Sequence, residues 1–177
     1  MVRAVNQRWL LKFWKRHLGT HRVPQWQAIV AENLSRISSN LSILDVVGTA
    51  STACFVVRFN GAMIETVYGG VDHRGHRLDD IMPPKHRDRW LVPYRLAVGC
   101  RCPIYTIYDV TDRAGRLVYY ERLLLPFGRD GQTVDRILAS VEFICPDGTF
   151  DDRELMLAQR DPPALRMSAR IEPQTLV

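Results

Sequence analysis

The chain has 177 residues, of which 46% are hydrophobic, so it is long and apolar enough for one domain with a real core. Its formal net charge of +5 comes largely from the N-terminal segment, where it forms a local basic arm rather than a global field. Basic residues alone supply no element for reading DNA or RNA, so we predict no nucleic-acid partner. Lys12 and Lys15 interrupt the only signal-like stretch, and no uncharged run is long enough to span a bilayer.

The four cysteines are unevenly placed, and Cys100 and Cys102 are too close in sequence to suggest the disulfide framework of a secreted domain. This usage favours a reducing compartment. Together with the absence of a signal peptide, it predicts a cytoplasmic protein.

The N-terminal segment 1–40 is predicted to be a helical lead-in. Its first helix carries an aromatic and apolar stripe opposite a basic arc and ends at Gly19. A second helical pattern runs from Trp26 to Ile37 and closes at 38–40. If the first helix does not pack on its own domain, the stripe would be buried against a second copy, and we predict a homodimer. The candidate interface residues are Trp9, Leu10, Phe13 and Trp14. Packing on the domain itself, or on a lipid surface, are the alternatives.

The central part of the chain alternates between strand and helix patterns. Pro93 is expected to kink or divide the longer helix, which Gly99 would end. The predicted elements are strands 42–47 and 53–59, a short helix at 61–68, a longer helix from Pro84, and a strand at 104–111.

The segment from Leu117 to Ile144 predicts a long antiparallel hairpin whose turn lies at 128–131. Its second strand has apolar residues at alternating positions, so one face is expected to be covered and the other to be wet or to face a ligand. Beyond Gly148 the sequence predicts a short helix and a loosely ordered polar tail.

Particular residues resemble the PAS domain, a sensory and protein-interaction fold. Gly75 to Pro83 reads GHRLDDIMP, which is similar to the PAS segment that turns into the long helix. Tyr120 to Phe127, followed by Asp130-Gly131 and 134–138, resembles more narrowly the stand-alone PAS-like proteins common in alphaproteobacteria. The resemblance covers roughly 41–143.

The resemblance implies an α+β fold: a five-stranded antiparallel sheet in the order 2-1-5-4-3, with helices on one face around a small pocket. It also implies a lead-in at 1–40, a PAS-like domain at 41–146 and a C-terminal extension at 147–177. The flavin-binding PAS subfamily needs an Asn-Cys-Arg-Phe-Leu motif, whereas residues 65–72 read ETVYGGVD. We therefore expect no bound cofactor, and no motif of an output module follows the domain.

A ligand pocket would be lined by aromatic residues of the long helix and the neighbouring strand, unless those side chains fill it themselves. The candidates are Tyr68, Trp90, Tyr94, Val98, Tyr105 and Arg122. Because Glu121 and Arg122 are adjacent on a strand, they point to opposite faces. If Arg122 faces the covered side, it would bind a carboxylate or phosphate, or form an internal ion pair with Asp109 or Asp135, and the ion pair is favoured.

Other reactive residues carry weaker patterns. His73, His76 and His86 lie among charged loop residues, and we predict no metal site. Cys100 and Cys102 flank Arg101, which would suit a redox sensor, although packing is the simpler explanation. No nucleophile, general base and acidic residue occur at the spacing of a catalytic motif, so we predict no catalytic residue.

The sequence thus predicts a non-catalytic bacterial regulatory domain that acts through an unidentified protein partner and is gated by a small ligand. A redox- or ligand-sensing module is the alternative, and a small enzyme of unknown reaction is third.

Overall fold

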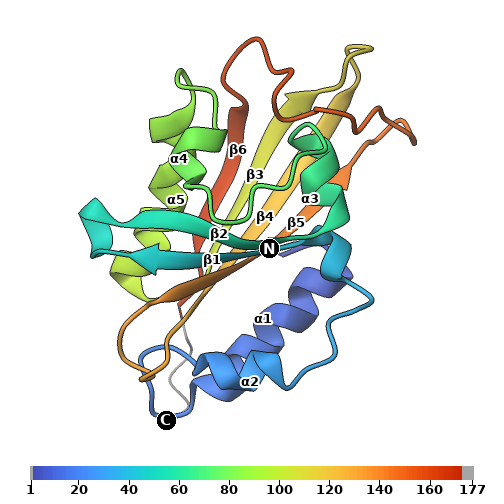
Figure 1. Ribbon diagram of the computed structural model, residues 1–177. Coiled ribbons are helices and arrows are strands. Elements are labelled where there is room, and N and C mark those ends of the chain that lie inside the picture. Colours follow the sequence, from blue (N-terminus) through green and yellow to red (C-terminus); the bar gives the residue numbers. More distant parts are fainter. Residues whose placement is uncertain (1, 173–177) are drawn as a thin grey trace.

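Six antiparallel strands form one sheet in the order β2-β1-β5-β4-β3-β6 in the computed structural model, which describes residues 2–172 (Figure 1). The first five strands have the predicted order, and the α+β fold class is confirmed. The strands are β1 (Leu41–Val47), β2 (Cys54–Asn60), β3 (Ile104–Thr111), β4 (Leu117–Phe127), β5 (Arg136–Ile144) and β6 (Ala164–Arg170).

Strand β6 was not predicted. It extends the sheet by pairing with the edge of β3, in the region for which the sequence indicates only a polar tail. Residues 153–157 form turns in place of the predicted short helix. The rest of the predicted tail, 173–177, lies outside the described residues.

Three helices pack on one face of the sheet: α3 (Ala62–Val67), α4 (Leu78–Ile81) and α5 (Arg87–Cys100) (Figure 1). Pro93 lies inside α5 and does not divide it. Its ring is buried, so packing against the core offsets the lost backbone hydrogen bond. The helix ends at Cys100, one residue beyond the predicted Gly99, where Arg101 adopts a left-handed conformation (φ 54°).

The opposite face of the sheet is covered by α1 (Val5–Leu18) and α2 (Trp26–Val30), so the prediction that this face is wet or faces a ligand is wrong (Figure 1). Trp14 Nε1 donates a hydrogen bond of 2.7 Å to the Pro126 carbonyl, and Gln7 donates to the carbonyls of Glu121 and Ser140. These bonds hold α1 against β4 and β5. The second predicted helix is much shorter than expected, because it ends at Val30 and turns lead from there to a short 3-10 helix, Ser38–Asn40. A second 3-10 helix, Ala50–Thr52, lies between β1 and β2.

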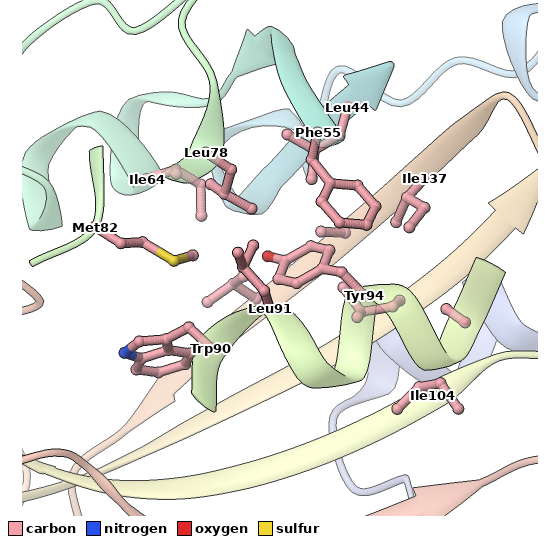
Figure 2. Close-up of a cluster of buried hydrophobic side chains, with 14 of the residues drawn as sticks. Leu44, Phe55, Ile64, Leu78, Met82, Trp90, Leu91, Tyr94, Ile104 and Ile137 are labelled. Carbon is pink, nitrogen blue, oxygen red and sulfur yellow. The ribbon is translucent and has the colours of Figure 1, made fainter. Parts of the chain in front are cut away.

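Two apolar clusters therefore sandwich the sheet. One lies between the sheet and α3, α4 and α5, where Phe55 and Tyr94 meet with ring centroids 5.3 Å apart (Figure 2). The other lies beneath α1. Within residues 2–172, none of the helices has the length and apolar character needed to cross a membrane.

Candidate functional site

Arg122 of β4 is the most unusual side chain of the domain, because its guanidinium is fully buried among aromatic rings. Trp90 and Tyr94 stand one turn apart on α5, and their ring centroids lie 5.0 and 4.6 Å from Cζ of Arg122. Tyr108 of β3 and Tyr120 of β4 lie 5.5 and 5.8 Å away. These four rings form what we call the aromatic cage, and each offers its π face to the cation.

No acceptor in residues 2–172 bonds to the guanidinium: Nε, Nη1 and Nη2 of Arg122 are all buried and without a hydrogen-bond partner. The cross-strand neighbour Thr106 also has a buried hydroxyl without a partner. Cation–π contacts are worth about 2 kcal/mol when desolvated, whereas burying an unpaired ion costs several kcal/mol. The aromatic cage thus offsets only part of the cost of this charge.

The predicted internal ion pair of Arg122 is wrong. Asp109 pairs with Arg166 at 2.8 Å, and Asp135 pairs with Arg129 at 2.9 Å. Both of those arginines are solvent-exposed, so these carboxylates lie at the rim of the sheet. Strand parity alone does not reveal which charged side chains lie at the rim and which lie in the centre.

The neighbouring Glu121 points to the other face, as its position next to Arg122 requires. Its carboxylate is fully buried under the N-terminal segment, where it accepts hydrogen bonds from the guanidinium of Arg3 and from the hydroxyl of Tyr105. Burial, and then this carboxylate, raise the pKa of Tyr105 to about 12. The ion pair of β4 therefore joins the buried Glu121 to Arg3, whose side chain is half-exposed.

A cavity of about 30 Å³ adjoins the aromatic cage. Tyr94 and Tyr120 belong to both, so the guanidinium lies one side chain away from the cavity. Tyr68 and His73 complete its polar wall, together with Ser42, which donates to Asn60 at 2.7 Å. The apolar part of the wall comes from Ile64, Leu78, Ile81, Ala139 and Val141.

The charges around the cavity are set by burial. Burial raises the pKa of Tyr68 and Tyr120, so both hydroxyls are neutral and able to donate, although the Arg122 charge acts in the opposite direction on each. Burial and the neighbouring His76 lower the pKa of His73, whose Nδ1 is buried without a partner. At neutral pH Arg122 is therefore the dominant charge, and its field favours negative charge at the cavity wall.

The family model of the PAS domain matches residues 2–142 of the chain. That is more than half of the sequence, and the strand order agrees with the match. The chain belongs to the PAS domain family. No curated protein sequence matches the chain, and no solved structure does. PAS domains are generally non-catalytic sensory and regulatory modules, so membership gives this chain a sensory or regulatory character.

The predicted pocket residues of this PAS domain are not all brought together. Tyr68 and Tyr94 line the cavity, and Trp90 joins the aromatic cage with Tyr94. Val98 is buried in the same apolar cluster but does not line the cavity. The prediction of Tyr105 as a pocket residue is wrong, because its side chain faces α1 on the opposite side of the sheet.

Two site residues, Tyr108 and Tyr120, were missed. Tyr120 could have been found from strand alternation, whereas Tyr108 also needs the register of β3 against β4. Tyr120 is two positions from Arg122 on β4 and so shares its face, and it pairs directly with Tyr108 on β3. A register that places Tyr105 on the pocket face is off by one residue, which turns every side chain to the wrong side.

The predicted dimer stripe on α1 also needs correction. Leu10, Phe13 and Trp14 are buried against the sheet of the same chain, where they meet residues such as Leu123. Of the four predicted interface residues, only Trp9 is exposed. The stripe is therefore a core element, and the alternative of packing on its own domain is the one realised.

The histidines and cysteines lie apart from the aromatic cage. The rings of His73 and His76 are 6.3 Å apart in the loop before α4, and His86 is buried at the start of α5 with both ring nitrogens unpartnered. Cys100 and Cys102 are joined by a disulfide bond at the end of α5.

A larger surface depression of about 810 Å³ lies between the β3–β4 turn and residues 158–164. Two of its acidic residues have partners: Asp112 accepts from Arg116, and Asp109 from Arg166, while Asp161 is exposed. It contains no buried charge without a partner, so the smaller cavity beside Arg122 is the better candidate for a ligand site.

Proposed function

We propose that this PAS domain is a non-catalytic cytoplasmic regulatory module that acts through a protein partner and is gated by a small ligand in the cavity beside Arg122. The observation that carries the proposal is the guanidinium, buried without an acceptor next to a cavity with a polar wall. Structural arginines deep in a core have partners, because an unpaired ion is costly there. A site that keeps an unpaired buried charge, despite its energetic cost, is typical of ligand recognition.

The gating follows from the elements that surround the cavity. Its wall is contributed by β1, β5, α3, α4 and α5 through Ser42, Ala139, Ile64, Leu78 and Tyr94. A ligand that orders these side chains changes the relative stability of helix arrangements on that face, which a partner protein then recognises. The same proposal divides the chain into three parts: a lead-in, 1–40, a PAS domain, 41–146, and an extension, 147–177. The lead-in covers the face of the sheet opposite the cavity.

Native mass spectrometry of freshly purified protein tests the ligand. We expect a retained small molecule that is lost in Arg122→Met, which keeps a long side chain but no charge. The matched control is Arg58→Met, which removes an exposed arginine paired with Asp45. Two results together would count against ligand gating. The wild-type mass would equal that of the bare chain, and the protein would capture the same partners from lysate before and after denaturation and refolding.

Homodimerisation is proposed through surfaces other than the buried stripe. Trp9 and Val5 are exposed on α1, at 41% and 70%, and are available to a second copy. Light scattering of wild type and Trp9→Lys tests this. A monomer at tens of micromolar in both would refute it.

Redox sensing is a second candidate function, favoured by the bond between Cys100 and Cys102. It closes a short loop around Arg101 where α5 leads into β3, so its reduction would free the junction between the pocket helix and the sheet. Forming the bond releases two electrons and two protons to an oxidant such as a low-molecular-weight disulfide. Alkylation before and after reduction, with the free Cys54 and Cys145 as internal reference, measures its population.

A further inference from the structure

The charge of the cavity limits what it can bind. Arg122 contributes one positive charge, and Glu121, the acid nearest in sequence, points to the other face, where it is paired with Arg3. Tyr68 and Tyr120 are neutral because burial raises the pKa of each hydroxyl, and burial keeps His73 neutral at neutral pH by lowering its pKa. A ligand with a single negative charge balances this environment. A dianion would leave one charge buried and unpaired.

The donors of the wall also favour an anion. Tyr68, Tyr94 and Tyr120 all line this one small space, and a phenol O–H is a good donor to a carboxylate oxygen. The three guanidinium nitrogens and the Thr106 hydroxyl beside them have no partner of their own. Donors without acceptors therefore lie next to the cavity, behind the tyrosines that line it, and the Arg122 charge stabilises a negative charge there.

The size of the cavity limits the ligand further. At about 30 Å³ it holds a molecule of only a few non-hydrogen atoms. Its remaining wall is apolar, with Ile64, Leu78 and Val141 among the lining side chains. A planar head that accepts several hydrogen bonds, with at most a short apolar tail, fits both parts of the wall.

We propose that the cavity binds a small monocarboxylate, whose oxygens accept hydrogen bonds from the tyrosine hydroxyls and whose charge is balanced by Arg122. The inference rests on the ligand gating proposed above and specifies its ligand class. A carboxylate is preferred over a spherical anion because it offers two acceptor oxygens to the tyrosine hydroxyls that line the cavity.

The probes are sodium formate, acetate and propionate, compared with chloride and phosphate at constant ionic strength. We expect the melting temperature of the wild-type protein to rise with formate or acetate concentration, as binding to the folded state alone requires. The proton resonance of formate should broaden when protein is added. Chloride and phosphate should do neither.

Variants localise the binding. Arg122→Met should weaken carboxylate binding about tenfold or more, because it removes the balancing charge, and Tyr68→Phe several-fold, because it removes one hydrogen-bond donor. Arg58→Met is the matched control and should bind as wild type does. Arg122→Lys keeps the charge but loses the planar donor set, and it should bind with intermediate affinity. The wild-type titrations remain decisive even if one variant fails to fold.

The outcomes separate the ligand class from the wider proposal. If chloride or phosphate acts as strongly as the carboxylates, or if Arg122→Met binds formate as wild type does, the inference is wrong. If no carboxylate binds while native mass spectrometry finds a neutral molecule, the inference fails and ligand gating survives. If neither a probe nor a retained molecule is found, both fail, and the aromatic cage is a structural device.

Discussion

Glu121 and Arg122 are consecutive residues of β4, and both side chains are completely buried, one on each face of the sheet. Their environments differ: Glu121 is bound by Arg3 and Tyr105, whereas Arg122 has no hydrogen-bond partner among residues 2–172 and lies within the aromatic cage. One peptide unit thus joins the aromatic cage to the anchorage of the N-terminal segment. The two residues should also respond to substitution in opposite ways.

Arg122→Met is expected to leave the free energy of unfolding within about 1 kcal/mol of wild type, or to raise it, when no ligand is bound. The charge has no acceptor to lose, and replacing a buried ion by an apolar side chain of similar length is often neutral or stabilising. Urea denaturation at neutral pH measures this. Arg122→Ala is the companion variant and should lose about 2–5 kcal/mol, since it leaves a cavity among the four rings. A large loss in the methionine variant would reveal a hidden partner of the guanidinium.

Glu121→Gln is expected to destabilise the protein by about 1–3 kcal/mol, because the amide presents donors to Arg3 and removes an acceptor from a buried network. The matched control is Arg58→Gln, which breaks the exposed pair with Asp45 and should cost less than about 1 kcal/mol. The same denaturation series compares them. Equal effects of the two changes would mean that the Arg3 bond does not persist in solution.

Much of the fold follows from local patterns, whereas the site depends on register. The β4–β5 hairpin and the first helix, α1, were predictable because alternation and an amphipathic stripe are local signals. Strand β6 has no such signal: Ala164–Arg170 is mostly exposed and forms a strand because the free edge of β3 offers hydrogen bonds. The aromatic cage needs the pairing of β3 with β4, which places Tyr108, not Tyr105, beside Arg122. No local pattern in the sequence gives that register.

Glu142 lies directly opposite Glu121 in the β4–β5 ladder, and it predicts a pH effect. Burial, together with the Glu121 charge, raises the pKa of Glu142 above its ordinary 4.5, even though a hydrogen bond with Asn6 acts in the other direction. A raised carboxyl pKa means that the folded state prefers the protonated form. Its contribution to stability is therefore fully present below pH 4.5 and is lost as pH rises through the raised pKa.

Glu142→Gln should accordingly stabilise the protein at pH 7, by about 0.2–1 kcal/mol for a like-charged cross-strand pair, and should make no difference near pH 4. Unfolding free energies at the two pH values give the comparison. A gain of the same size at both would trace the effect to packing and not to charge.

The last prediction concerns α1, whose apolar stripe lies against β4 and β5 of its own chain. Leu10 and Phe13 are buried there, while Lys12 points into solvent between them. Leu10→Ala should cost about 2–5 kcal/mol of unfolding free energy, as expected for a core leucine, whereas Lys12→Ala should stay within about 0.5 kcal/mol of wild type.

Deletion of residues 1–19 removes α1 from the cover of this face and leaves only α2. It should expose Leu123, Leu125 and Leu138, which pack in the cluster beneath α1, and so should raise the binding of a hydrophobic dye and promote aggregation. Light scattering and dye fluorescence on the same samples distinguish a core role of α1 from a role in an interface between copies. If the deletion instead turned a stable dimer into a well-folded monomer, and Leu10→Ala left the unfolding free energy unchanged, the helix would belong to an interface between copies, and the core role assigned to it would be wrong.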